Sequence, residues 1–251
     1  MKKNQKVIFT FSLLLLLAFL FWPVSFPKNL QLKETLNSSP FSQVVIIFNS
    51  GGLGYTPLEK ATDFAPIVLE IKNTLQEWGY NSLIVSYQRT ENNFWGKIWG
   101  IREVLNSFKN QSQELAREIE WLVKNNPQTK IIITGLSNGG AFVEETFKDL
   151  SQEAKSSVYV IEAGVPFWQK IDQSSQNILR LNNGGKDSLA KGKIKTLIFS
   201  FLKAPFKLLI SSLSREKISF SEAMRVPGHE YQWKEVSPEI ISFLKVNLSQ
   251  F

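Results

Sequence analysis

Ser137 is the residue of this sequence with the clearest chemical potential. It lies in GLSNG (135–139), which fits the pattern G-x-S-x-G, between the β-branched run 130–134 and a helical pattern over 138–150. A serine at a sharp strand-to-helix turn is held in a strained conformation that exposes its hydroxyl. The start of the following helix directs free N–H groups toward a reacting oxygen. We therefore predict that Ser137 is a nucleophile; the alternative is an ordinary glycine-rich turn.

A serine nucleophile needs a base and an acid that orients the base. His229 is the only histidine in the sequence and follows Ser137 near the C-terminus, so it is the candidate base, although a single histidine is often passive. Asp187 follows the apolar run 177–181 in the turn NNGGKDS, at the strand end where catalytic groups gather in open α/β sheets. We predict Asp187 as the acid. Glu162, at the end of the preceding strand, is the alternative.

A glycine-rich loop after the first apolar run could supply an oxyanion hole. In FNSGGLGY (48–55), glycine lets backbone N–H groups approach a substrate oxygen. We predict the N–H of Asn138 as one donor and that of Gly51 or Gly52 as the other. The loop lacks the Gly-Lys-Ser/Thr ending of a nucleotide-binding P-loop.

Together these features resemble the α/β-hydrolase superfamily. The resemblance covers about residues 43 to 249 and rests on the order Ser137, Asp187, His229, the NSGG loop, the GLSNGG turn and the terminal PGHEY. It implies hydrolysis, or less often transfer, of an acyl group through a covalent serine ester. The expected function is therefore a serine esterase or lipase. An acyltransferase, thioesterase or peptidase with the same triad, and a non-catalytic binding module with this fold, are the alternatives.

The elements that must position these residues alternate along the chain. Short apolar runs predict strands, and amphipathic segments between them predict helices. The predicted strands span 43–48, 81–87, 130–134, 156–161 and 177–181, and the predicted helices 65–78, 112–125, 138–150 and 238–248. This alternation indicates an α/β fold, with a mostly parallel central sheet covered by helices on both faces. We expect one hydrolase domain over 43–251.

Composition removes several classes of chemistry. The sequence has no cysteine and one histidine, which excludes disulfides, thiol catalysis and cysteine- or histidine-rich metal sites. We therefore expect no metal and no cofactor. The net charge is +7, but no zinc-finger, RNP or helix-turn-helix signature accompanies it, so we expect no nucleic-acid partner.

The N-terminus is typical of a targeting segment. Lys2, Lys3 and Lys6 precede an uncharged apolar stretch over 7–26, which we interpret as a hydrophobic helix within a 1–26 signal peptide or signal-anchor. The length of the stretch and the absence of a good cleavage site favour the uncleaved anchor over the cleaved signal. Residues 27–42 are polar and predict a linker. The catalytic domain would then lie on the exocytoplasmic side, membrane-anchored or secreted.

Two further segments bear on the substrate, which we expect to be a small-molecule or lipid ester. The aromatic residues of 92–101 could line an acyl pocket or form a lid packed on the core. Residues 191–215 carry five lysines and one arginine among large apolar residues, with no acid. Such a segment suits an anionic membrane surface. The alternative is a buried crossover helix whose lysines extend to solvent.

Overall fold

A computed structural model gives the fold of the chain. The description covers Leu32, 42–169, 175–196, Lys203, Ile210, Ser211 and 226–248. The signal segment 1–26, nearly all of the linker and most of 191–215 lie outside these residues. Within them, no helix has the length and apolar character needed to cross a bilayer.

The centre of the domain is a five-stranded sheet in which every pairing is parallel, in the order β2-β1-β3-β4-β5. The strands are β1 Val44–Asn49, β2 Ser82–Ser86, β3 Lys130–Leu136, β4 Val158–Ala163 and β5 Ile178–Leu181. Parallel strands end at the same edge, so the loops after β1, β3, β4 and β5 meet there. This edge carries the candidate site.

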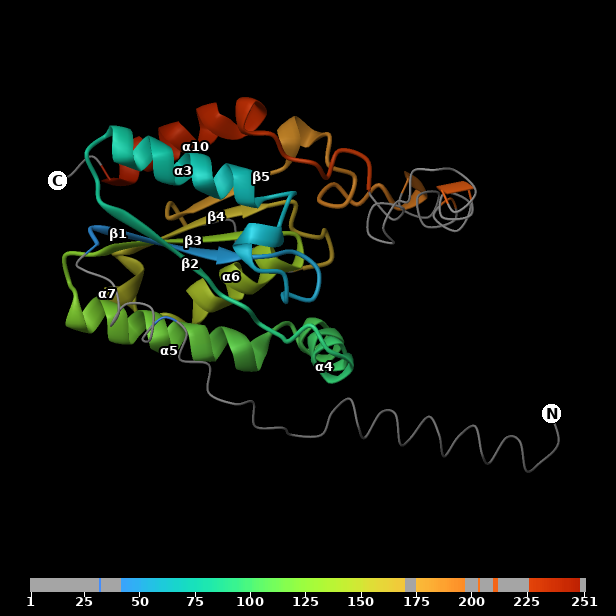
Figure 1. Ribbon diagram of the computed structural model, residues 1–251, viewed down its shortest axis with the longest axis horizontal. Coiled ribbons are helices and arrows are strands. Elements are labelled where there is room, and N and C mark those ends of the chain that lie inside the picture. Colours follow the sequence, from blue (N-terminus) through green and yellow to red (C-terminus); the bar gives the residue numbers. More distant parts are fainter. Residues whose placement is uncertain are drawn as a thin grey trace.

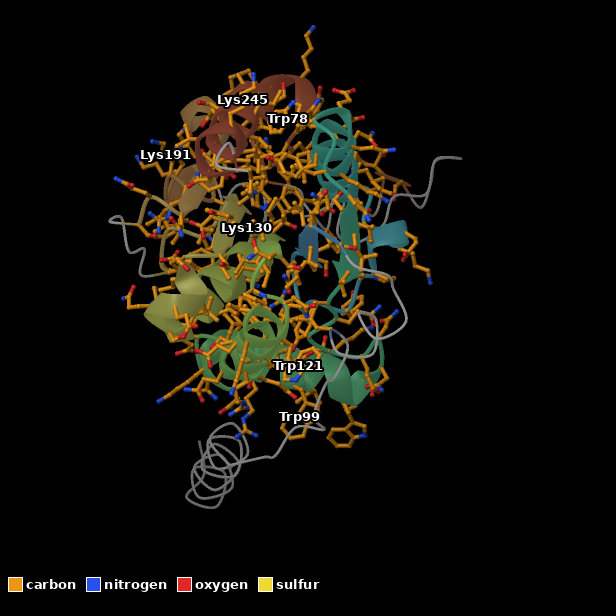
Figure 2. The ribbon with its side chains drawn as sticks, turned by 90° about the vertical axis from the view of Figure 1, so that its left-hand side faces the viewer. Trp78, Trp99, Trp121, Lys130, Lys191 and Lys245 are labelled. Atoms are coloured by element: carbon orange, nitrogen blue, oxygen red, sulfur yellow. The ribbon has the colours of Figure 1, made fainter. Side chains whose placement is uncertain are left out.

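Helices cover both faces of the sheet (Figure 1), as the sequence predicts. The helices are α3 Ala65–Glu77, α4 Phe94–Leu105, α5 Lys109–Asn125, α6 Asn138–Asp149, α7 Gln152–Lys155 and α10 Trp233–Leu248, with short 3-10 turns η1 Leu58–Lys60 and η2 Asn183–Gly185. Helices α3 and α10 pack on one face, and α5, α6 and α7 on the other. Lys245 of α10 lies over the ring of Trp78, 5.8 Å from its centroid, and both are visible at one end of the molecule (Figure 2).

The two apolar layers follow from the alternation of side chains along each strand. In β3, Ile131 and Ile133 belong to the layer under α5 and α6, while Ile132 belongs to the layer under α3 and α10. All three are fully buried. A strand covered on both faces is buried at nearly every position, which is why β1 and β3 contain continuous runs of β-branched residues.

The predicted strands and helices are present, although α5 begins at Lys109 rather than at 112 and the short α7 was not predicted. Two further differences have a physical reason. The last helix begins at Trp233 rather than Pro238, so the proline lies inside it. Proline is favoured in the first turn of a helix, which led to the later start. The helix α4 was not predicted, because Gly96 and Gly100 lower its helix propensity. It is started by Asn93, whose Oδ1 accepts from Gly96 N at 2.6 Å.

Candidate active site

Ser137 lies in the turn that joins β3 to α6. Its φ of 55° and ψ of −119° are strained for a residue with a side chain, and it is the N-cap of α6. Its N–H donates to Ala163 O at the end of β4, at 2.8 Å. Ser137 is only half-buried, so this strained turn leaves the residue accessible.

The glycines on either side of Ser137 are required by close backbone approach. A Cβ added to Gly135 would lie 2.6 Å from Gly140 N. A Cβ added to Gly139 would lie 2.5 Å from Ser50 O and 2.7 Å from Asn49 O. These neighbours are backbone atoms, which cannot move aside cheaply. The turn around Ser137 and the glycine loop after β1 are therefore in direct contact.

Asp187 and His229 are joined by a hydrogen bond of 2.8 Å between Asp187 Oδ2 and His229 Nδ1. The Asp187 side chain is fully buried and that of His229 is 17% exposed. Tyr231, which follows two residues later, donates its hydroxyl to the same Oδ2 at 2.5 Å. The other oxygen of Asp187 accepts from the N–H groups of Leu189, at 2.8 Å, and Ala190, at 3.1 Å.

These contacts keep Asp187 ionised. Burial alone would raise its pKa, but hydrogen bonds from His229, Tyr231 and Ala190 N–H outweigh burial and lower the pKa below the ordinary aspartate value. An ionised carboxylate at Nδ1 favours the tautomer that donates from Nδ1. The Nε2 atom of His229 then carries the free lone pair.

The loops that carry the acid and the histidine are tied to each other. Asn183 donates its side-chain amide to Gly228 O at 3.1 Å and to Glu230 O at 3.0 Å. Gly228 has a φ of 78°, and a Cβ there would lie 3.0 Å from Asp187 N. Gly228 of the PGHEY sequence is therefore needed for this close approach to the acid turn.

Gly164 places His229 beside the serine turn. It follows Ala163, the residue that accepts the Ser137 N–H, and has a φ of 59°. A Cβ on Gly164 would lie 2.7 Å from both Asp187 Oδ2 and His229 Nδ1. The histidine ring therefore packs on the backbone next to Ala163, the residue whose carbonyl accepts the Ser137 N–H.

The predicted oxyanion donors lie at the contact between the loop and the turn. Within the described part of the chain, the N–H groups of Gly51 and Gly52 form no hydrogen bond. Asn138 is the first residue of α6, where an N–H has no partner inside the helix. Both Gly51 and Asn138 are half-buried, and Gly52 is exposed.

Arg89 was not predicted from the sequence as a site residue, but it lies under the glycine-rich loop 50–54. Its Nη2 donates to Ser50 O at 2.9 Å and to Gly52 O at 3.4 Å. Its Cζ lies 5.2 Å from the ring centroids of both Phe108 and Phe142. The side chain is buried, and burial lowers its pKa to about 10. Its position just after β2, at the edge shared with the serine turn, is the signal that could have identified it.

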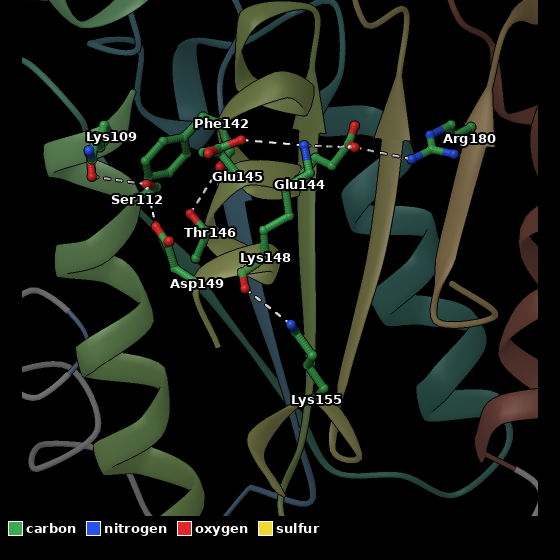
Figure 3. A network of polar contacts seen from close by, with 10 residues as sticks. All are labelled: Lys109, Ser112, Phe142, Glu144, Glu145, Thr146, Lys148, Asp149, Lys155 and Arg180. Atoms are coloured by element: carbon green, nitrogen blue, oxygen red, sulfur yellow. Dashed lines mark hydrogen bonds and ion pairs between the residues drawn. The ribbon is translucent and has the colours of Figure 1, made fainter. Parts of the chain in front are cut away.

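Glu162, the alternative acid, has a different partner. Its Oε1 accepts from Arg180 Nε at 2.6 Å, and its side chain is fully buried. Arg180 also pairs with Glu144 at 3.2 Å, and Lys148 pairs with Glu144 at 3.2 Å. Figure 3 shows Glu144 and Lys148 on α6 beside Arg180 on β5. Burial and the nearby Glu144 raise the pKa of Glu162 to about 8, although Arg180 lowers it.

Comparison with solved structures finds esterases and a serine hydrolase. Trichoderma reesei cutinase in complex with a phosphonate inhibitor is 17% identical, with 63% of this chain and 71% of that chain covered and a TM-score of 0.43. An acetylxylan esterase is 14% identical, with 55% and 80% covered and a TM-score of 0.40. An α/β serine hydrolase without lid from Xanthomonas campestris is 12% identical, with 57% and 60% covered and a TM-score of 0.31.

No protein-family model and no curated protein sequence matches the chain. The fold assignment therefore rests on this chain's own strand order, parallel pairing and strand–serine–helix turn. These show an α/β fold with an all-parallel five-stranded sheet, and the strand–serine–helix turn is consistent with an α/β-hydrolase-like fold.

Proposed function

We propose that this protein is a serine hydrolase that cleaves carboxylic esters through an acyl-serine intermediate. Ser137 is the nucleophile, His229 the general base and Asp187 the acid that orients it. The N–H groups of Asn138 and Gly51 stabilise the oxyanion, with Gly52 as the alternative second donor.

Acylation begins with attack of Ser137 Oγ on the ester carbonyl carbon, while its proton passes to His229 Nε2. The carbonyl oxygen becomes an oxyanion, and N–H groups fixed in advance stabilise it without reorganisation. When the intermediate collapses, the bond to the alkoxy group breaks. The leaving alcohol takes the proton from His229, and an ester remains on Ser137.

Deacylation repeats the steps with water as the nucleophile. His229 Nε2 takes a proton from water, the resulting hydroxide attacks the acyl carbon, and Ser137 leaves with the proton returned from His229. Asp187 stays ionised throughout and stabilises the imidazolium, consistent with its lowered pKa.

The hydrogen bond between Asp187 and His229, packed on Gly164 next to the strained Ser137, carries this proposal. A passive surface histidine would not need a fully buried carboxylate with four hydrogen bonds. Ser137 has a positive φ, a conformation that glycine adopts more easily. A turn without a chemical role would not require serine at this position. Cutinase and acetylxylan esterase among the similar structures agree with an ester substrate.

We further propose that the domain is held at the outer surface of a membrane by its N-terminal segment. The helix α4 supports lipid contact, because it exposes Phe94 (69%), Trp95 (59%), Ile101 (50%) and Leu105 (64%). Large apolar groups exposed together are typical of an interaction surface. Ile194 is also 55% exposed, among the lysines of 191–196, at the start of the basic segment 191–215. Digestion of intact cells with an added protease tests whether the domain lies on the outer side of the membrane, because only an exposed domain would be cleaved.

The experiment for the enzymatic role is steady-state hydrolysis of p-nitrophenyl esters of increasing acyl length by the full chain in detergent. Ser137→Ala and His229→Ala should abolish turnover above background, and Asp187→Asn should lower kcat by about 10⁴-fold. Asp149→Asn, on the far end of α6, is the matched control and should retain activity. Unchanged hydrolysis in Ser137→Ala would contradict the proposal. No hydrolysis by the folded wild-type chain would favour a binding module.

A further inference from the structure

The guanidinium of Arg89 is a buried cation that forms no salt bridge with any residue that the structure describes. Its contacts are hydrogen bonds to two loop carbonyls and the faces of two phenylalanine rings, while the Glu103 carboxylate acts on it only as a nearby charge that raises its pKa. Its Nε is buried without a hydrogen-bond partner in the described ranges. Burying a charge is expensive unless good partners compensate it. The burial of Arg89 under the glycine loop 50–54 therefore suggests a role that offsets this cost.

The loop is built closely around the guanidinium. Arg89 N donates to Gly54 O at 2.9 Å, and a Cβ on Gly54 would lie 2.8 Å from Arg89 Nη2. Gly52 and Gly54 both have positive φ, at 58° and 80°. The backbone from Ser50 to Gly54 therefore curves over the guanidinium, and its carbonyl groups at 50 and 52 face inward.

The direction of these carbonyls fixes the direction of the adjoining N–H groups. A trans peptide is planar, and its C=O and N–H bonds point in opposite directions. Because Ser50 O is bonded to Arg89, the N–H of Gly51 points away from the guanidinium. The same reasoning applies to the N–H of Leu53, since Gly52 O also faces Arg89. Gly51 N–H is one of the donors without a partner in the described residues.

We infer that Arg89 is a positioning residue for the oxyanion hole: by holding the carbonyls of Ser50 and Gly52, it orients the Gly51 N–H toward the developing oxyanion. This inference rests on the proposed ester hydrolysis at Ser137. Arg89 itself touches no reacting atom. It acts through the loop, which in turn contacts the serine turn at Gly139.

Two physical effects make an arginine effective here. One nitrogen, Nη2, donates to both carbonyls, and the planar guanidinium that carries it is held between the rings of Phe108 and Phe142, with Cζ 5.2 Å from each centroid. Its positive charge also polarises the two peptide groups, so the N–H at the far end becomes a better donor. With a pKa of about 10, Arg89 remains charged at neutral pH.

The test compares kcat and KM of the full chain for p-nitrophenyl acetate, with the active fraction titrated by a fluorophosphonate. The variants are Arg89→Lys, which keeps the charge but not the planar guanidinium held by the two rings, and Arg89→Met, which removes both. Arg102→Met is the matched control, because Arg102 is a buried arginine that lies over the Trp99 ring and does not bond the loop. Thermal unfolding of each variant checks that it is folded.

An interaction that acts only in the transition state lowers kcat and leaves KM nearly unchanged. Arg89→Met should lower kcat by about 10²–10³-fold, as loss of one oxyanion donor does, with Arg89→Lys intermediate and Arg102→Met near wild type. If Arg89→Met does not fold, Arg89→Lys decides alone. Equal kcat in Arg89→Lys and Arg102→Met, or a higher KM with unchanged kcat, would overturn the inference and leave the hydrolase function intact. A wild-type chain without activity or labelling would overturn both.

Discussion

Replacing Glu162 with glutamine should remove a loss of folding stability that the wild-type protein suffers between pH 6 and pH 9. Glu162 is fully buried, and burial with the nearby Glu144 raises its pKa from 4.5 to about 8 despite the bond from Arg180. The folded state therefore binds more protons than the unfolded state between pH 4.5 and pH 8. Stability must fall as pH rises through this window.

The size of the effect follows from the two pKa values. Each unit of difference is worth about 1.4 kcal/mol, which gives a loss of about 2–3 kcal/mol in the free energy of unfolding between pH 6 and pH 9. Glu162→Gln cannot ionise and should show no such loss. Its ester turnover should also persist, because the partner of Glu162 is Arg180 rather than His229.

Urea unfolding at several pH values measures this slope. Glu145→Gln is the matched control, since Glu145 lies in the same network beside Lys148 but is 33% exposed. Parallel stability curves for wild type and Glu162→Gln would refute the reasoning, because Glu162 would then be ionised already at pH 6. Loss of turnover in Glu162→Gln with normal turnover in Asp187→Asn would reverse the assignment of the acid.

Three further outcomes are expected. Gly139→Ala should abolish ester turnover and lower the thermal midpoint, because its Cβ would lie 2.5 Å from Ser50 O; an active, stable variant would contradict the close approach. Tyr231→Phe should lower the free energy of unfolding at pH 7 by about 1–3 kcal/mol, through loss of a hydrogen bond to a charged group. Since that bond lowers the pKa of Asp187, the deficit should shrink below pH 4; a pH-independent deficit in urea titrations would argue against this origin. Ile133→Ala should cost about 2–5 kcal/mol in the same assay, and less than 1 kcal/mol would show that β3 is not at the core.

The parts of the fold that the sequence predicts are those specified locally. Residues 130–134 form a strand because Ile131, Ile132, Ile133 and Thr134 are all β-branched, and the glycines after them mark the turn at Ser137. Chain order and turn chemistry were enough to suggest Asp187 and His229 as neighbours, and the structure joins them by a hydrogen bond. Their catalytic roles remain predictions for experiment.

The parts that the sequence does not predict depend on packing between distant segments. Arg89 bonds a loop 39 residues earlier, and Tyr231 bonds an aspartate 44 residues earlier. The position of Arg89 just after β2 places it at the edge of the site, but no local pattern shows which loop it bonds or that Tyr231 bonds the acid. Glu162 was similarly ambiguous, because only the position of Arg180 on the neighbouring strand β5 shows which group it faces.

Fluorophosphonate labelling of the full chain, with the adduct located by mass spectrometry, tests the central claim most directly. The reagent phosphonylates only an activated serine, so the account predicts a single adduct on Ser137 that is absent in Ser137→Ala and strongly slowed in His229→Ala. An adduct on another serine, or labelling of Ser137 that does not depend on His229, would contradict the account.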